Sequence, residues 1–318
     1  MATTAPAQPR PIHRHGLASA LMLLTTFFWA SNIVTGKMAL AGFSSLALAQ
    51  IRMAATAILY VALYLAWRGL PRVRLSRRQW LLLALAAFTG ITLNQIFYIG
   101  GLARTSVTHA GLIQAVGPVI VLLLAGMMKL EALTLAKGVG MAISFIGVAA
   151  LLVEKPPQGT GAHWQGDALL LAASAVFAYY TILMKEFAGV LDTLTLNALV
   201  FVLGTILLIP ICVRSTEHVK WASVPAQAWW GFGFMVLFGS LISYLIYGFA
   251  LQELSASNVA SFSYLQPIMA AALGVWLVGE RITGTVVLGG VLILLGCYVA
   301  ELGRGQKKHL HHLATGKV

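Results

Sequence analysis

Long apolar stretches, separated by short polar segments, run along almost the whole chain. Most of them are close to the ~20 apolar residues that an α-helix needs to cross a lipid bilayer. Backbone polar groups find no water inside a bilayer, so each stretch is expected to be helical. The alternating segments of about 10 residues that are typical of a membrane β-barrel are not seen in the sequence. The pattern predicts an all-α integral membrane protein with ten transmembrane helices, near residues 17–37, 44–67, 79–102, 106–128, 133–153, 166–185, 193–213, 227–251, 255–278 and 283–302.

The composition of the chain favours the same class of protein. Of its 318 residues, 59% are hydrophobic and only 9% are charged, whereas a soluble domain carries roughly 25% charged residues. The first apolar stretch is longer than the apolar region of a cleaved signal peptide, so it is expected to remain as a helix. The two cysteines, Cys212 and Cys297, lie in apolar stretches without CxxC spacing. No metal site and no cofactor are therefore predicted.

The net charge of +12 raises the question of a nucleic-acid partner. The placement of the basic residues argues against it, because most of them lie in the two terminal segments and in alternate loops such as residues 68–78. The cytoplasmic loops of membrane proteins carry such an excess of Lys and Arg. We therefore expect a protein of the cell (inner) membrane with both termini in the cytoplasm, whose basic residues contact anionic lipid rather than nucleic acid.

A shift of 149 residues aligns one half of the chain with the other. The aligned pairs are Trp80 with Trp229, Gly90 with Gly239, Tyr98 with Tyr247, Pro118 with Pro267, Glu131 with Glu280, Gly140 with Gly289 and Gly147 with Gly296. The spacing from proline to glutamate recurs in the same register as two aromatic pairs, which chance rarely produces. Two residues 149 positions apart are called repeat partners below.

Each half contains five predicted helices, and because five is odd the second half enters the membrane with reversed orientation. The halves are therefore predicted to form an inverted repeat, a design that transporters use around a central substrate site. A receptor or scaffold has less need of such symmetry. The predicted organisation is a cytoplasmic tail (1–16), a first five-helix repeat (17–153), an external linker (154–165), a second five-helix repeat (166–302) and a basic cytoplasmic tail (303–318).

Several motifs in a fixed order make the chain similar to a known family. They are WASNIVTGK at 29–37, Arg52, the segments 118–131, 138–152 and 263–280, and GGVLILLG at 289–296. Over residues 17–302 the chain resembles the EamA-type ten-helix carriers of the drug/metabolite transporter superfamily. The resemblance implies a carrier of small metabolites, often an exporter, with a cavity lined mainly by helices 1, 3, 4, 6, 8 and 9 and with the other helices as scaffold. Ala178 and Phe201 stand where Trp29 and Arg52 would recur, so the two halves are not equivalent.

Polar side chains occupy matching faces of helices 3 and 8. The set comprises Asn94, Gln95 and Tyr98 in helix 3 and their repeat partners Ser243, Tyr244 and Tyr247 in helix 8. Residues three and four positions apart share one face of a helix. Polar groups turn away from lipid, so these residues are predicted to bind a substrate in a pocket. The alternative is that they form hydrogen bonds between helices.

Further candidate substrate-binding residues lie on helices 1, 4, 6 and 9. Trp29 and Asn32 share a stripe of helix 1, and Tyr180 lies on the matching part of helix 6. The aromatic rings could stack on a flat substrate or pack against neighbouring helices. Gln114 and Tyr264 lie close to the paired prolines and are expected to reach the cavity.

Arg52, His109 and the paired prolines carry separate hypotheses. Arg52 could hold a substrate carboxylate, but helix 2 is expected at the periphery, which favours a structural bond to helix-end carbonyls. His109 opens helix 4 and could gate the carrier or relay a proton; a hydrogen-bonded histidine at a helix end is the favoured alternative. Pro118 and Pro267 are expected to kink helices 4 and 9 and to act as hinges during opening.

The positions of the acidic residues restrict the possible functions, because all 9 lie at helix ends or in loops. Without a carboxylate in helix 1, proton-coupled export of cationic drugs is disfavoured. No GxxxxGK[ST] motif indicates an ATP-driven motor, and no paired nucleophile and base indicates an enzyme. The sequence favours a facilitative exporter of neutral or aromatic amino acids that works by alternating access. The alternative is efflux of drugs, nucleotide sugars, sugar phosphates or other metabolites, including proton-coupled efflux. The sequence gives no oligomeric state.

Overall fold

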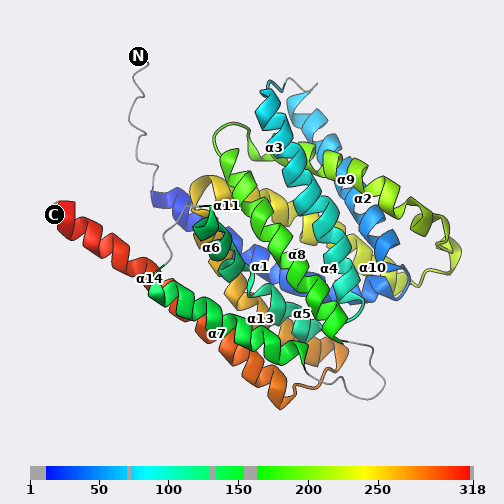
Figure 1. Cartoon of the computed structure of the whole chain (residues 1–318). Coiled ribbons are helices and arrows are strands. Elements are labelled where there is room, and N and C mark those ends of the chain that lie inside the picture. Colours follow the sequence, from blue (N-terminus) through cyan, green and yellow to red (C-terminus); the bar gives the residue numbers. More distant parts are fainter. Residues whose placement is uncertain (1–11, 70–72, 129–133, 154–162, 316–318) are drawn as a thin grey trace.

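The computed structural model describes residues 12–69, 73–128, 134–153 and 163–315, and helices make up nearly all of these segments (Figure 1). An isolated β-bridge between Ala188 and Leu191 is the only strand-like pairing among them. The α-helices are α1 (Ile12–Leu40), α2 (Ser45–Arg68), α3 (Arg77–Ala87), α4 (Asn94–Leu102), α5 (Val107–Gln114), α6 (Gly117–Met127), α7 (Leu135–Leu152), α8 (His163–Glu186), α9 (Thr193–Glu217), α10 (Ala226–Phe234), α11 (Ser243–Glu253), α12 (Ala256–Ser261), α13 (Gln266–Leu273) and α14 (Gly284–Thr315). The π-helical segments η1 (Phe88–Leu93), η3 (Met235–Ile242) and η5 (Gly274–Val278) and the 3₁₀ segments η2 (Trp221–Ser223) and η4 (Phe262–Leu265) complete the order.

The predicted membrane spans are present as helices. Within the described residues, 9 helices are long and apolar enough to cross a membrane, and a shorter apolar helix, Gly284–Ala300, lies at the tenth predicted position. The prediction of an all-α integral membrane protein is thus confirmed. Helix α1 already begins at Ile12 and α14 continues to Thr315, so both helices reach into the segments predicted as tails.

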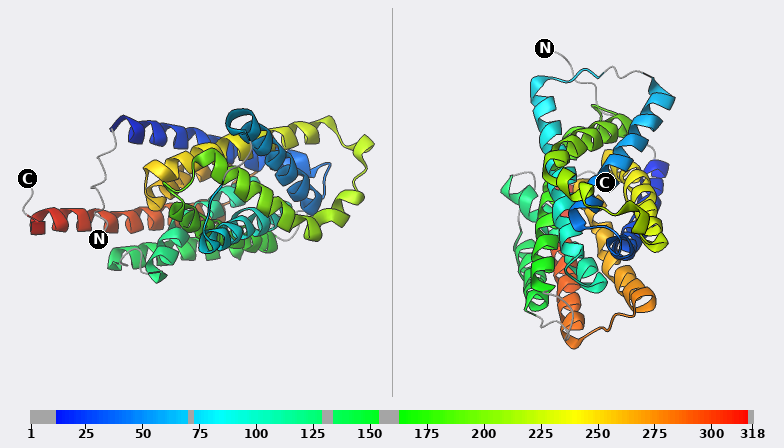
Figure 2. Two further views of the ribbon diagram at one scale, coloured as in Figure 1. Left: turned by 90° about the horizontal axis from the view of Figure 1, so that it is seen from above. Right: turned by 90° about the vertical axis from the view of Figure 1, so that its right-hand side faces the viewer.

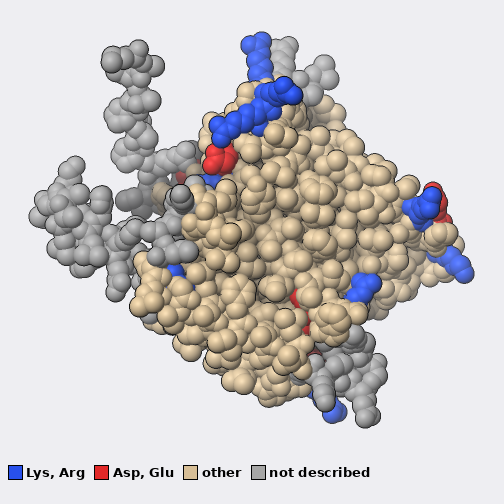
Figure 3. All heavy atoms as spheres, in the orientation of Figure 1, with Lys and Arg blue, Asp and Glu red and all other residues tan. Residues whose placement is uncertain are grey.

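The outer surface of the bundle suits contact with lipid. Large apolar side chains point outward, and those of Ile58, Leu81 and Trp276 are 68%, 70% and 80% exposed. Figure 3 shows a broad face with few charged side chains, most of them near its edges. Soluble monomers rarely expose so large an apolar area, so this surface is the one that meets the bilayer.

The crossing of α7 and α14, which lie side by side (Figures 1 and 2), reveals the symmetry between the repeats. A Cβ atom on Gly140 would lie 2.4 Å from the carbonyl oxygen of Gly296, and one on Gly147 would lie 2.7 Å from that of Gly289. Only glycine lets the two backbones approach so closely. Gly140 is the repeat partner of Gly289, and Gly147 that of Gly296, so the two contacts exchange when the repeats are exchanged. This is the relation that a two-fold axis requires.

A second pair, α2 and α9, packs together away from the α7–α14 pair (Figure 1). The rings of Tyr60 and Phe201 meet there with centroids 4.9 Å apart. The remaining spans lie between these two pairs. They bring α1 against α11 and α13, α4 against α8, and α5 against α13. The centre of the molecule is therefore built from helices of both repeats.

Helices 3 and 8 are both interrupted by a π-helical segment at matching positions, η1 and η3. Each segment contains a glycine that lets a side chain of the other repeat approach. A Cβ on Gly90 would lie 2.2 Å from the ring of Tyr180, and one on Gly239 would lie 2.2 Å from Oδ1 of Asn32. A π-helical turn often marks a functional site, and here both turns lie beside the central cavity.

Helices 4 and 9 are interrupted at the paired prolines, as the sequence predicts. Helix 4 ends its first segment at Gln114 and resumes in α6, in which Pro118 lies in the first turn. Helix 9 passes through the 3₁₀ segment η4 before α13, in which Pro267 lies in the first turn. Proline lacks the backbone N–H that a continuous helix would use, so it fits the start of a new segment. The hinge role of both residues remains a prediction.

Candidate functional site

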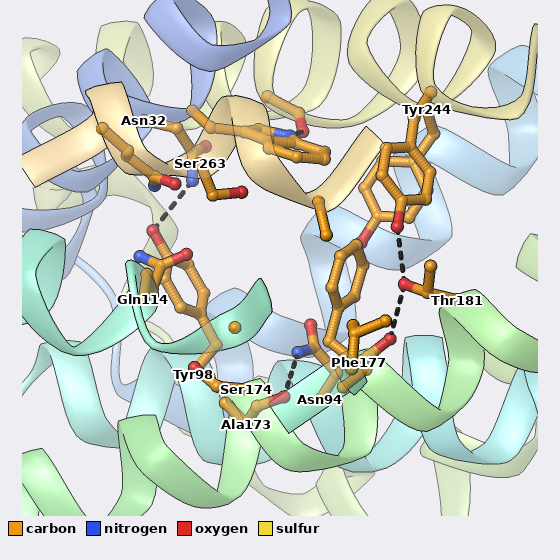
Figure 4. Close-up of a pocket in the computed structure, with 18 of the residues that line it drawn as sticks. Asn32, Asn94, Tyr98, Gln114, Ala173, Ser174, Phe177, Thr181, Tyr244 and Ser263 are labelled. Atoms are coloured by element: carbon orange, nitrogen blue, oxygen red, sulfur yellow. Dashed lines mark hydrogen bonds between the residues drawn. The ribbon is translucent and has the colours of Figure 1, made fainter. Parts of the chain in front are cut away.

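A central cavity opens between the two repeats (Figure 4). Its lining comes from helices 1, 2, 3, 4, 6, 8 and 9 and consists of Trp29, Asn32, Arg52, Asn94, Gln95, Tyr98, Gln114, Gly117, Pro118, Val121, Ala173, Ser174, Phe177, Ala178, Thr181, Gly239, Tyr244, Tyr247, Ala260, Ser263 and Gln266. Among the residues that the structure describes, the lining holds one cation and no acidic residue. Transporters with inverted repeats place their substrate at such an interface.

Two hydrogen bonds in the cavity wall are related by the repeat (Figure 4). Nδ2 of Asn32 donates to the hydroxyl of Tyr98 at 2.9 Å, which joins helices 1 and 3. The hydroxyls of Thr181 and Tyr247 lie 2.5 Å apart and join helices 6 and 8. Thr181 is the repeat partner of Asn32, and Tyr247 is that of Tyr98. Each repeat thus uses the same pair of positions to tie its first helix to its third.

An aromatic group forms one side of the cavity. The ring of Trp29 lies 5.9 Å from Phe177, 6.2 Å from Tyr244 and 5.4 Å from Tyr247 between centroids. Nε1 of Trp29 donates to the carbonyl of Gly239 at 3.3 Å, which holds the indole in place. Aromatic faces with a few hydroxyl tips suit a flat or apolar group that also carries polar atoms.

A polar network of Arg52 and two amide side chains forms another part of the cavity wall. Oε1 of Gln95 accepts from Nη1 of Arg52 at 3.1 Å, and Nε2 of Gln95 donates to Oδ1 of Asn94 at 3.0 Å. Asn94 in turn donates to the carbonyl of Ala173 at 3.0 Å. Nε of Arg52 donates to the hydroxyl of Ser240 at 3.0 Å. The network therefore links helices 2, 3, 6 and 8 around the cavity, and it holds the amide planes in fixed orientations.

Comparison with known proteins identifies the family of this symmetric bundle. Residues 16–153 and 164–302 each match the EamA-like transporter family. The chain belongs to the EamA-like transporter family. The resemblance seen in the sequence is confirmed, and the protein is a multi-pass membrane transporter of small metabolites rather than an enzyme.

Individual relatives of this EamA-like transporter cover most of its length. An uncharacterized transporter of Archaeoglobus fulgidus is 29% identical over 90% of this chain and 98% of its own. A probable terminal-alkyne amino-acid exporter of Streptantibioticus cattleyicolor is 28% identical over 90% and 95%. An S-adenosylmethionine/S-adenosylhomocysteine transporter of Chlamydia trachomatis is 23% identical over 88% of both chains. One solved crystal structure shares the fold, with a TM-score of 0.64, 17% identity and coverage of 91% and 98%.

The structure brings most of the predicted substrate-binding residues of the transporter together. Those that line the cavity are Trp29, Asn32, Asn94, Gln95, Tyr98, Gln114, Tyr244 and Tyr247. Tyr180, Ser243 and Tyr264 do not line it. Contact of any of these residues with a substrate remains a prediction.

Tyr180 lies behind the cavity wall. Its side chain is fully buried, and its ring is tilted by 36° against that of Phe177, with centroids 5.4 Å apart. Phe177, one helical turn earlier on α8, takes the place in the cavity that the sequence assigned to Tyr180. The small Gly90 on helix 3 receives the tyrosine ring, so the residue serves helix packing.

Local helix geometry explains the positions of Ser243 and Tyr264. Ser243 follows the π-helical segment η3, and its hydroxyl donates to the carbonyl of Phe238 at 2.5 Å, which the irregular turn leaves available. Tyr264 lies in the 3₁₀ segment η4. Ser263 and Gln266, three positions apart, both line the cavity, whereas Tyr264 does not.

Several cavity residues were not among the predicted substrate-binding residues. Ser174, Phe177 and Thr181 lie three and four positions apart on α8, a spacing that would have revealed their shared face. Arg52 also belongs to the lining, although helix 2 was expected to serve as scaffold. The expected bond of Arg52 to helix-end carbonyls is wrong, because Arg52 donates to the side chains of Gln95 and Ser240.

His109 lies outside the cavity lining, at one end of the bundle. It is buried, and its Nδ1 lies 2.8 Å from Oδ2 of Asp167 in α8. The hydroxyl of Thr105 donates to the other oxygen of Asp167. This arrangement fits the favoured interpretation of His109 as a hydrogen-bonded residue at a helix end. A gating role for it remains a prediction.

Proposed function

We propose that this transporter exports neutral amino acids, with a preference for aromatic ones, by facilitative alternating access in the cell membrane. The observation that carries the proposal is the cavity between the repeats, where aromatic rings face amide and hydroxyl groups. The aromatic group around Trp29 suits an apolar side chain, and the polar network around Gln95 suits the charged groups of an amino acid. The amino-acid exporter named among the relatives supports the same class of substrate.

The symmetry of the bundle supports alternating access. Rocking one repeat against the other would expose the same cavity first to one side of the membrane and then to the other. The distribution of basic residues supports an orientation with both termini in the cytoplasm. Without a carboxylate in the lining, coupling to protons at the cavity itself has no evident acceptor.

A second candidate is efflux of another metabolite through the same cavity. It is supported by the relative named for transport of S-adenosylmethionine and S-adenosylhomocysteine. Both candidates share the cavity and differ in the solute. A flux assay with solutes of several classes therefore separates them.

The proposal is tested with purified protein in liposomes and a panel of radiolabelled solutes, without ATP. We expect saturable flux of neutral amino acids, strongest for aromatic ones. Flux of sugar phosphates or nucleotides without flux of any amino acid would contradict the proposal. Tyr244→Ala and Gln95→Ala should each lower the rate about tenfold by removing a cavity contact. Tyr298→Ala is the matched control, because that tyrosine is 61% exposed on the outer surface.

A further inference from the structure

Arg52 is a buried cation at the cavity wall, and no acidic side chain of the described residues pairs with it. The residue is 2% exposed, and the described lining of the cavity holds no carboxylate. Its hydrogen bonds run from Nε to the hydroxyl of Ser240 and from Nη1 to Oε1 of Gln95. A guanidinium has five N–H donors, and Nη2 makes no hydrogen bond with another described residue. An ionised side chain within a membrane helix normally pairs with an opposite charge or serves a transported solute.

The repeat shows that the fold does not need a cation at this position. The repeat partner of Arg52 is Phe201, and the repeat partner of Gln95 is Tyr244. Phe201 is fully buried and packs edge-on against Tyr244, with centroids 5.0 Å apart. The contact between Arg52 and Gln95 in the first repeat therefore corresponds to an aromatic contact in the second. Since an aromatic ring fills the same place in the second repeat, packing alone does not explain the guanidinium.

Three further atoms of the lining are buried and make no hydrogen bond with any described residue. They are the donors Nε2 of Gln114 and Nε2 of Gln266 and the acceptor Oδ1 of Asn32. Gln266 is 2% exposed and Asn32 is 4% exposed. Buried polar atoms normally have partners. Together with Nη2 of Arg52 they leave the cavity with unused donors for an anion and an unused acceptor for an N–H group. This polarity matches a zwitterion whose carboxylate lies toward Arg52.

We infer that Arg52 is the carboxylate-binding residue of the transport cavity and restricts the carrier to substrates that bear a carboxylate. The substrate's carboxylate binds the edge of the guanidinium that carries Nη2, and its apolar part lies against the aromatic group around Trp29. Where the substrate has an ammonium group, that group donates a hydrogen bond to Oδ1 of Asn32. Cations without a carboxylate are disfavoured by the charge of Arg52. The inference deepens the proposed function by naming the substrate class, and it rests on that function only in placing the substrate in this cavity.

The test compares four ligands that share one ring, namely L-phenylalanine, L-phenylalaninamide, 3-phenylpropionate and phenethylamine. Binding to the purified full chain is measured by titration calorimetry. We expect the wild type to bind the two ligands with a carboxylate and to bind the amide and the amine at least 30-fold more weakly, because the buried cation loses its partner. Arg52→Gln should weaken binding of both carboxylates by about 30-fold and should not weaken binding of the amide, a cation that the side chain then no longer repels. Arg52→Lys should restore about a third of that loss, since it keeps the charge but not the fork of N–H groups.

Arg104→Gln serves as the matched control. Arg104 is exposed and donates to the carbonyl of Gly100 at 2.7 Å, outside the cavity, so its removal should leave all four affinities unchanged. Should Arg52→Gln fail to fold, Arg52→Phe, which copies the second repeat, takes its place. The four-ligand comparison on the wild type also stands without any variant.

Equal affinity of the wild type for phenylalanine and its amide would overturn the inference, as would an Arg52→Gln variant that binds carboxylates normally. Failure of the wild type to bind either carboxylate would also count against it. If 3-phenylpropionate binds in a manner that depends on Arg52 while no amino acid binds, the result would support the inference. It would contradict the proposal that the substrate is an amino acid. Amino-acid transport that is unchanged in Arg52→Gln would leave the proposed function standing and remove the inference.

Discussion

The two ends of the helical bundle are built on the same plan and are held together differently. The end at which Glu280 meets α5 is called the Glu280 end, and the end at which Lys185 meets the last turn of α11 is called the Lys185 end. A carrier that works by alternating access must open each end in turn. The bonds at the two ends therefore set how readily each one opens.

Both ends share a lysine and a serine cap. Lys37 donates to the carbonyl of Thr105 at the Glu280 end, and Lys185 donates to that of Leu254 at the other. Thr105 and Leu254 are repeat partners. The hydroxyls of Ser106 and its repeat partner Ser255 cap the helices that follow. These shared contacts close the third span of each repeat against the first.

At the Glu280 end, the carboxylates of Glu280 and Asp167 add to this plan. Glu280 accepts from the backbone N–H groups of Val107 and Thr108 at 2.6 and 2.9 Å and from the hydroxyl of Thr108 at 2.7 Å. Asp167 binds His109 and Thr105. Charge-assisted hydrogen bonds are stronger than neutral ones. We expect these two carboxylates to contribute more to the closure of the Glu280 end than its lysine does.

Replacement of Glu280 should give the largest effect, because its carboxylate supplies three hydrogen bonds to the start of α5. Glu280→Ala is expected to lower the free energy of unfolding by about 3 kcal/mol, since hydrogen bonds to a charged group contribute about 1.5–3 kcal/mol each and are not additive. The measurement is unfolding of the purified protein in detergent. Glu217→Ala, at an exposed helix end, is the control. Equal stability of both variants would show that the cap contributes nothing.

Conversion of the Glu280 end into a copy of its counterpart tests the second network. Asp167→Ala removes the acceptor of His109 and Thr105 and should lower stability by about 2 kcal/mol. Adding His109→Asn and Thr105→Leu introduces the repeat partners Asn258 and Leu254. The triple variant should recover at least half of the loss, because the Thr105 hydroxyl and the His109 ring, the two groups that Asp167 binds, are then also absent. If the stability losses of the three substitutions simply add, the expected coupling between Thr105, His109 and Asp167 would be contradicted.

The paired prolines should affect rate rather than stability. Pro118→Ala combined with Pro267→Ala would allow continuous helices 4 and 9 and is expected to slow transport about tenfold, as loss of a hinge does. Flux in liposomes measures the rate, and calorimetry confirms that the variant folds. Pro210→Ala is the control, because Pro210 lies inside α9, away from the cavity. An unchanged rate in the double variant would remove the hinge hypothesis.

The lysines should give the smallest effect and the closest agreement between the two ends. Lys37→Met and Lys185→Met each remove bonds to carbonyls at the end of a span. Each is expected to cost about 1 kcal/mol of stability. The same unfolding assay measures both variants. A large loss of stability in only one of them would show that the two lysines do not contribute equally.

Much of the fold follows from the sequence, because hydropathy and the repeat are local or periodic signals. The apolar stretches place the spans, and the matched Pro118 and Pro267 place the interruptions of helices 4 and 9. The alignment of Tyr98 with Tyr247 anticipates two faces that do meet in one cavity. Helix spacing alone could indicate these faces, since residues three and four apart lie together.

The rest depends on contacts between distant segments and on irregular helix geometry. Arg52 reaches the cavity because helices 2, 3 and 8 converge there, which no spacing within helix 2 reveals. Tyr264 lies outside the cavity lining, in a 3₁₀ segment that the apolar pattern does not predict. The cap that Glu280 provides spans 173 residues of sequence. Such contacts become visible only in the folded bundle.

Exchange of substrate across the membrane tests the central claim most directly. Liposomes that contain the purified protein are loaded with unlabelled phenylalanine, and uptake of labelled phenylalanine is followed without ATP or an ion gradient. If the carrier with bound substrate reorients faster than the empty carrier, uptake into loaded liposomes should be about threefold faster than uptake into empty liposomes. Tyr244→Ala should abolish this difference. Uptake that is unaffected by internal substrate and does not saturate would contradict alternating access through this cavity.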